Sequence, residues 1–145
     1  MLALGCDHGG YPLMKEVIHY LEENHIAYKN FGTYSEDSVD YPVYGKAVAG
    51  AVASGECEKG ILICGTGIGI SITANKVKGI RCALCSEPWS AEMTRRHNDA
   101  NVLAMGAGCV GPLMARQIVT AFLNTGFEGG RHQRRVDKMM AIENR

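Results

Sequence analysis

The chain has 145 residues, about the length of one ordinary domain, and 46% of them are hydrophobic while 21% are charged. This composition excludes a disordered chain and predicts a single domain over residues 1–145 with a hydrophobic core of its own. Fifteen basic residues balance fifteen acidic ones, which argues against a general nucleic-acid-binding protein.

The sequence also bears on location and on the state of the cysteines. No apolar run approaches the length of a membrane span, and the first residues lack the basic segment of a signal peptide. We therefore expect a cytoplasmic protein without a membrane partner, whose six cysteines are reduced thiols. Cys82 and Cys85 form a C-x-x-C pair, but they lie on an expected strand, where residues three apart point to opposite faces, so no metal site is expected.

Apolar runs alternate with helix signals along the chain. In chain order the expected elements are a strand at 1–5, a helix opened by Pro12, a strand at 26–31, a helix at 41–54, a strand at 60–64, a helix at 70–76, a strand at 80–85, a helix at 88–96, a strand at 101–105, a helix at 112–123 and a tail helix at 132–143. The run at 60–64 is continuous, which is typical of a buried parallel strand. Proline suits the first position of a helix, which supports the starts at Pro12, Pro88 and Pro112.

Five strands separated by helices predict βαβ crossovers, and hence an α/β fold with a parallel sheet covered on both faces. A flavodoxin-like strand order of 2-1-3-4-5 would place the first and third strands side by side. Ligands bind at such a switch point, beyond the carboxyl ends of the strands.

A glycine-rich loop leaves the third strand at this predicted crevice. Its residues are Gly65, Thr66, Gly67, Ile68 and Gly69. Glycines let main-chain N–H groups approach a phosphate or an oxyanion closely, and the following helix N-terminus adds a favourable dipole. The loop is not a Walker A motif, but it half-resembles a dinucleotide fingerprint, with Glu87 in the place of the ribose-binding acid. A nucleotide-binding module therefore stays an alternative.

Several polar side chains border the same crevice. Cys64 is either a packed thiol or a thiolate that the helix N-terminus stabilises, and the spacing leaves both open. Asp7 is a helix cap or a ligand for a sugar hydroxyl, and His8 next to it is a candidate phosphate ligand. His97 closes the fourth helix, either as an exposed helix end or as a general acid.

The tail carries a pair of arginines. Arg131 and Arg135 are four residues apart and therefore share one face of the tail helix. Such a face is either a solvated surface or a site for a phosphate dianion. Because the tail follows a complete five-strand sheet, we expect it to pack on a neighbouring subunit, with Met139 and Met140 as its apolar anchors.

Six motifs, taken together and in this order, resemble one family over almost the whole chain. They are Gly5-Cys6-Asp7-His8, Asp40-Tyr41-Pro42, the run from Ile63 to Ile72, Ala74-Asn75-Lys76, the run from Arg96 to Asn101, and Glu128-Gly129-Gly130-Arg131-His132. The resemblance is to the sugar-phosphate isomerase family of ribose-5-phosphate isomerase B, which includes the galactose-6-phosphate isomerase subunits. It implies a cofactor-free aldose–ketose isomerase on a three-layer, Rossmann-like α/β sandwich.

The resemblance also implies roles for individual residues. Cys64 matches the catalytic base and His97 the acid that opens the sugar ring. The positions that match ligand-binding residues are Asp7, His8, Gly65, Thr66, Gly67, Ile68, Gly69 and Asn98. Arg131 and Arg135 match phosphate-binding arginines that the family supplies from the partner subunit, so a homodimer or homotetramer with a shared site, and a tail at 128–145 in the interface, are expected.

The expected reaction interconverts ribose 5-phosphate and ribulose 5-phosphate through an enediolate. Cys64 moves the proton, and the N–H groups of the glycine loop with the Thr66 hydroxyl stabilise the developing charge, without a metal. One departure concerns substrate size: Gly108 stands where family members often carry an arginine. A hexose 6-phosphate isomerase, for allose or galactose phosphates, and a sugar-phosphate-binding module without turnover therefore stay alternatives.

Overall fold

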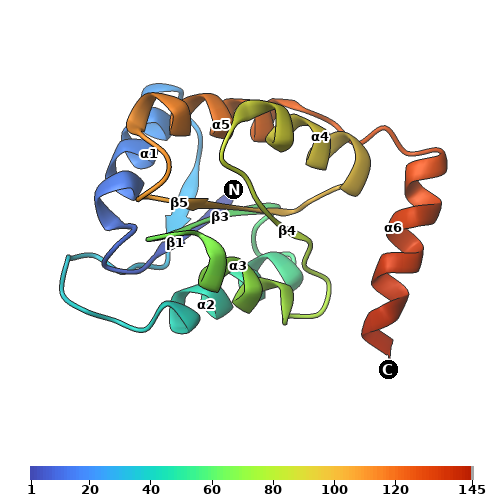
Figure 1. Cartoon of the computed structure of the whole chain (residues 1–145), viewed down its shortest axis with the longest axis horizontal. Helices are drawn as coiled ribbons and strands as arrows, with labels where there is room; N and C mark the ends of the chain where they lie inside the picture. Colours follow the sequence, from blue (N-terminus) through green and yellow to red (C-terminus); the bar gives the residue numbers. More distant parts are fainter. Residues whose placement is uncertain (145) are drawn as a thin grey trace.

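All five expected strands form, and they pair in parallel in one sheet (Figure 1). The computed structural model describes residues 1–144. The strands are β1 (Leu2–Cys6), β2 (Tyr28–Asn30), β3 (Lys59–Cys64), β4 (Cys82–Leu84) and β5 (Val102–Gly106). The helices are α1 (Tyr11–Glu23), α2 (Tyr41–Ala53), α3 (Ile68–Asn75), α4 (Pro88–Asn98), α5 (Pro112–Asn124) and α6 (Arg131–Ala141), with a final 3-10 turn η1 (Ile142–Asn144). The predicted α/β class is confirmed.

The strand order differs from the predicted one. The sheet runs β2-β1-β3-β5-β4, so β5 lies between β3 and β4, and β4 forms the edge. Burial explains the exchange: all five residues of β5 are buried, whereas β4 has three residues, none of which is buried. A strand that is apolar on both faces gains most at the centre of a sheet, and a short strand tolerates the edge. β1 and β3 remain neighbours, so the predicted switch point is retained.

The helices cover the sheet in two layers. In Figure 1, α2 and α3 lie on one face, while α1, α4 and α5 lie on the other. Side chains alternate along each strand and supply both cores. In β3, Ile61 and Ile63 pack toward the α1–α5 side, whereas Leu62 and Cys64 pack toward α2 and α3. The sulfur of Cys64 therefore belongs to the face on which α3 begins.

Local sequence explains where the helices begin. All four prolines of the chain lie at the first or second position of a helix, in α1, α2, α4 and α5. α3 has no proline and begins at Ile68, two residues before its predicted start, because Gly67 turns the chain at a φ of 78°. That left-handed conformation is open to glycine at little cost.

The tail helix α6 stands beside the sandwich rather than on the sheet (Figure 1). It contacts α4, where the ring of its buried residue His132 stacks on His97, and its other buried residue is Val136. Arg131, Arg135 and Met139 are exposed. No helix in the described part of the chain is long and apolar enough to cross a membrane.

A buried arginine fastens the last turn of α4. The Arg95 guanidinium donates to the Asp99 carboxylate at 2.9 Å, to the Ala100 carbonyl at 2.7 Å and to the Thr125 carbonyl at 3.1 Å. Charge-assisted bonds of this kind are stronger than neutral ones. Arg95 therefore joins the end of α4 to the start of β5 and to the end of α5.

We expect Arg95→Met to lower the free energy of unfolding by about 2–4 kcal/mol, because it leaves buried carbonyls without their charged donor. Urea unfolding at one fixed protein concentration measures the change. The matched control is Arg134→Met, on the exposed face of α6, which should stay within about 0.5 kcal/mol of the unmodified chain. Equal destabilisation by both substitutions would contradict the role given to Arg95.

Candidate active site

The loops that follow β1, β3 and β5 meet at the carboxyl ends of the strands. Cys64 at the end of β3 is level with Gly106 at the end of β5. The N–H of Gly108 donates to the carbonyl of Gly65 at 2.9 Å, and a Cβ on Gly9 would lie 3.5 Å from the Gly65 nitrogen. Three loops that are distant in sequence thus share one crevice, as the switch-point rule predicts.

Two glycines let the β3–α3 loop fold tightly over the end of β5. A Cβ on Gly106 would collide with the main chain of Thr66. A Cβ on Gly67 would lie 2.7 Å from the Met105 carbonyl carbon, and the φ of 78° at Gly67 disfavours other residues in any case. Gly67, one of the glycines that suggested a binding loop, is therefore also needed for this close approach.

The Cys64 sulfur faces the glycine loop. Its side chain is buried, and Sγ accepts a hydrogen bond from the Gly67 N–H at 3.1 Å. The contact joins the end of β3 to Gly67, the residue that precedes α3.

Other cysteines lie in different surroundings. Burial raises the pKa of Cys6 and of Cys82 to about 12, with the charge of Asp7 adding to the effect at Cys6. Burial likewise raises the pKa of Cys85 to about 11. These thiols stay protonated near neutral pH, as expected of structural cysteines.

Part of the loop's hydrogen-bonding capacity is used within the loop. The Gly67 N–H is directed at Cys64, and the Ile68 N–H donates to Thr66 Oγ1 at 3.1 Å. The Thr66 oxygen is therefore an acceptor inside the loop, which leaves its hydroxyl proton for a ligand. Gly65 and Thr66 are exposed, whereas Gly67 is buried. The predicted cradle is thus narrower than the run from Gly65 to Gly69.

Asp7 and His8 directly follow the carboxyl end of β1. Asp7 is buried, and its Oδ1 accepts a hydrogen bond from the Gly10 N–H at 2.9 Å, so it holds the turn that leads into α1. His8 Nδ1 accepts a hydrogen bond from the Val39 N–H at 3.1 Å. The proton of the neutral imidazole then resides on Nε2, which makes His8 a donor at that nitrogen.

A cavity of about 600 Å³ opens next to these loops. Gly9, Gly65 and Gly108 line it from the three strand ends, and residues at the starts of α1 and α5 complete its wall. A Cβ on Gly108 would lie 3.1 Å from the Gly65 carbonyl oxygen. Of the glycine loop, only Gly65 lines this cavity, whereas the Cys64 sulfur lies on the other face of the sheet, toward α3.

His97 lies near the amino ends of the strands, whereas Cys64 lies at their carboxyl ends. α4 returns antiparallel to the strands, and its last turn is followed directly by the start of β5, whereas Cys64 is level with the end of β5. β5 has five residues and therefore four steps of ~3.3 Å, so its two ends are about 13 Å apart. One chain therefore does not bring the expected base and the expected acid together.

The site residues predicted from the sequence fall into two groups. We call Asp7, His8 and the loop from Cys64 to Gly69 the glycine-loop half-site. We call His97, Asn98, Arg131 and Arg135 the helix half-site, since they lie at the end of α4 and the start of α6. Arg131, Arg135 and Asn98 are exposed.

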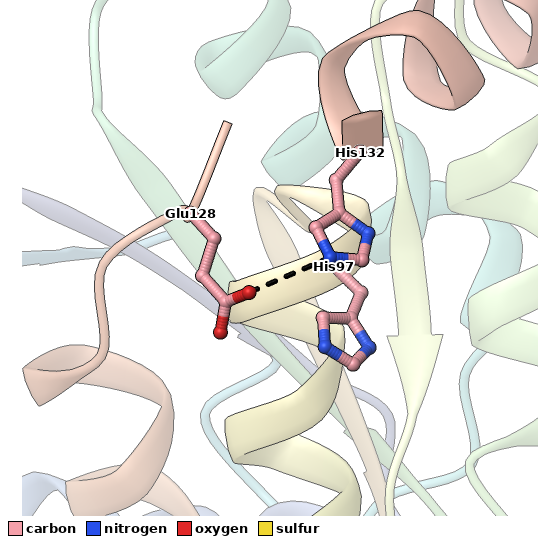
Figure 2. A group of neighbouring side chains, drawn as sticks. All are labelled: His97, Glu128 and His132. Atoms are coloured by element: carbon pink, nitrogen blue, oxygen red, sulfur yellow. Dashed lines mark ion pairs between the residues drawn. The ribbon is translucent and has the colours of Figure 1, made fainter. Parts of the chain in front are cut away.

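Sequence reasoning gave no role to two residues beside His97. The rings of His97 and His132 stack with centroids 4.3 Å apart and planes inclined by 11°. His132 Nε2 lies 3.4 Å from Glu128 Oε1, as Figure 2 shows. Burial, the neighbouring His97 and the Arg131 guanidinium lower the pKa of His132. No local pattern announces this contact, because it joins the ends of two helices.

The same three side chains could be considered as metal ligands. Ligand atoms of His97, Glu128 and His132 all lie within 4.8 Å of one another. However, an imidazole nitrogen presents its lone pair in the plane of its own ring. Two nearly parallel stacked rings cannot both direct a lone pair at one ion, so the arrangement favours a stacked pair over a chelate.

Comparisons with known proteins agree with this geometry. The family described as Ribose/Galactose Isomerase matches residues 2–139. The chain is 53% identical to ribose-5-phosphate isomerase B of Escherichia coli (strain K12), over 99% of this chain and 97% of that protein. A ribose-5-phosphate isomerase B structure from Clostridium thermocellum matches with a TM-score of 0.97 and 51% identity, covering 99% of this chain and 97% of that one. One from Thermotoga maritima matches with a TM-score of 0.94 and 46% identity, covering 97% of both chains. The chain belongs to the ribose/galactose isomerase family.

Proposed function

We propose that the chain isomerises ribose 5-phosphate to ribulose 5-phosphate through an enediolate, without a cofactor. The observation that carries the proposal is the buried Cys64 sulfur, which receives the Gly67 N–H at the mouth of a glycine loop. The relatives named ribose-5-phosphate isomerase B support the choice of substrate. A reactive thiolate requires a reducing compartment, so a cytoplasmic location is part of the proposal.

The sugar ring opens first in the proposed mechanism. His97 donates a proton to the ring oxygen, while Asp7, or a water that it holds, accepts the proton of the anomeric hydroxyl. An imidazole suits this step because it exchanges protons near neutral pH. The open-chain aldehyde then lies between the two half-sites.

The Cys64 thiolate next removes the C2 proton. The electron pair of the C2–H bond forms the C1–C2 double bond, and negative charge develops on the C1 oxygen. The Thr66 hydroxyl and the free N–H groups of the loop stabilise this charge. A proton then passes from the C2 hydroxyl to the C1 oxygen. The electron pair of the C1–C2 double bond takes the proton of the thiol at C1, the C2 oxygen forms the ketone, and Cys64 returns to the thiolate.

A second copy of the chain supplies the helix half-site in this proposal. His97, Asn98, Arg131 and Arg135 reach the glycine loop of the partner, so that the exposed guanidinium groups bind the substrate phosphate. In addition, a cavity of about 570 Å³ separates α6 from the β4 edge, with Met139 and Met140 in its lining. A groove of this kind is suited to part of a partner subunit, in a homodimer or a homotetramer.

A hexose 6-phosphate is the second candidate substrate. The favouring observation is Gly108, where an added Cβ would lie 3.1 Å from the Gly65 carbonyl oxygen and where family members often carry an arginine. Catalytic efficiencies for ribose 5-phosphate, allose 6-phosphate and galactose 6-phosphate, measured side by side, decide between the two candidates.

Isomerisation in deuterated water tests the proposed function directly. With ribose 5-phosphate as substrate, we expect ribulose 5-phosphate that carries deuterium at C1, because a thiol exchanges its proton with solvent. Nuclear magnetic resonance of the product measures the label. Binding of a nucleotide without any turnover would instead favour the nucleotide-binding module.

We expect Cys64→Ala to lower kcat by at least about 1000-fold, because the variant lacks the group that takes the C2 proton in the proposed mechanism. Calorimetry should show that ribose 5-phosphate still binds within a few-fold of the original affinity. The matched control is Cys57→Ala, which removes a buried thiol outside both half-sites and should retain most of the activity. A Cys64→Ala variant with near-normal turnover would exclude Cys64 as the base.

We expect mixed dimers to recover activity from two inactive parents. In a dimer of one Cys64→Ala subunit and one Arg131→Ala subunit, one of the two shared sites carries both changes and the other carries neither. An equal mixture, subunits exchanged at random, should reach about a quarter of the normal activity. Isolated mixed dimers that stay inactive would contradict a site shared between subunits.

A further inference from the structure

The imidazole of His97 is held from one side by a second imidazole. His97 lies on the last turn of α4, and His132 lies on the first turn of α6. The two rings are stacked at 4.3 Å, with planes 11° apart. His132 itself is buried, whereas His97 is only half-buried.

The supporting ring is itself anchored to α4. Glu128 Oε1 lies 3.4 Å from His132 Nε2, and the Glu128 N–H donates to the Arg96 carbonyl at 3.1 Å. Arg96 also lies 3.7 Å from the Glu128 carboxylate and directly precedes His97 in the chain. Glu128 thus contacts both Arg96, the residue before His97, and His132, whose ring stacks on His97. Figure 2 shows the side chains of His97, Glu128 and His132.

We propose that His132 is a positioning residue for His97: its ring, stacked on the His97 imidazole, fixes the plane in which that imidazole donates its proton to the sugar ring oxygen. This inference rests on the role of His97 in the proposed function. A side chain that must transfer a proton works only within a narrow range of orientations, and small misplacements cost large factors in rate.

The charge on the supporting ring matters as much as its shape. Burial, His97 and the Arg131 guanidinium lower the pKa of His132, and Glu128 opposes them only in part. His132 is therefore neutral near pH 7, above its lowered pKa. A neutral ring lets His97 carry the catalytic proton without repulsion from a second imidazolium, and its π face is favourable to a stacked cation.

Three variants of the full-length protein separate positioning from other roles. His132→Ala removes the ring, and His132→Phe restores a flat ring that cannot contact Glu128 through a nitrogen. Gln133→Ala is the matched control, because Gln133 is the next residue of the same turn and its side chain bonds only the exposed Asp137 among the described residues. The readouts are kcat and KM for ribose 5-phosphate, and the nuclear magnetic resonance signal of the His97 ring.

We expect His132→Ala to lower kcat by about 10- to 100-fold, with KM within a few-fold of normal. His132→Phe should recover most of this loss, and Gln133→Ala should change nothing. The His97 signal should move in His132→Ala, because the ring current of its neighbour is lost, and should return toward its original position in His132→Phe.

Several results would overturn the inference. Normal kcat in His132→Ala, or a raised KM with unchanged kcat, would show that His132 does not position the acid. An unchanged His97 signal in His132→Ala would refute the stack itself. If His132→Ala does not fold, His132→Phe decides alone: near-normal kcat supports the inference, and a tenfold loss overturns it. An inactive unmodified protein would instead refute the proposed function, while the His97 signal still tests the stack.

Discussion

The site depends on one hydrogen bond, from the Gly67 N–H to the sulfur of Cys64. This bond exists because the chain leaves the buried strand β3 and reverses within three residues. Such a turn requires a left-handed conformation at Gly67 and a bare main chain at Gly106, over which Thr66 passes. The position of β5 beside β3 is therefore a condition for the chemistry as well as for the core.

The same α/β topology divides the predicted site residues between the two ends of the strands. Each helix that follows a strand returns antiparallel to it, so residues at the end of α4 lie near the amino ends of the strands. His97 is therefore separated from Cys64 by the length of β5. The helix α6 carries Arg131 and Arg135 away from the sandwich, exposed to solvent. In a dimer with a twofold axis, any contact between the helix half-site of one copy and the glycine-loop half-site of the other occurs twice.

The helix half-site combines mobile charges with a rigid centre. Arg131 and Arg135 are exposed, and their long side chains can adapt to a phosphate dianion. The stacked imidazoles of His97 and His132, in contrast, are confined by contact with each other and by the link from Glu128 to Arg96. The two arginines thus differ from the imidazole pair in how far their side chains are confined.

Local sequence by itself determined the elements, their parallel pairing and the place of the crevice. Apolar runs, helix-starting prolines and the glycine loop are short-range signals, and the order of Asp7, Cys64 and His97 along the chain is legible without coordinates. It did not determine the strand order, because the choice between β4 and β5 for the central position depends on the burial available on both faces at once. Only the tertiary structure showed that the Gly67 N–H donates to the Cys64 sulfur and that His132 stacks on His97. It also showed that Cys64 and His97 lie at opposite ends of the strands. Each of these depends on distances between segments far apart in the chain, which the packing of helices against the sheet sets and no spacing of residues encodes.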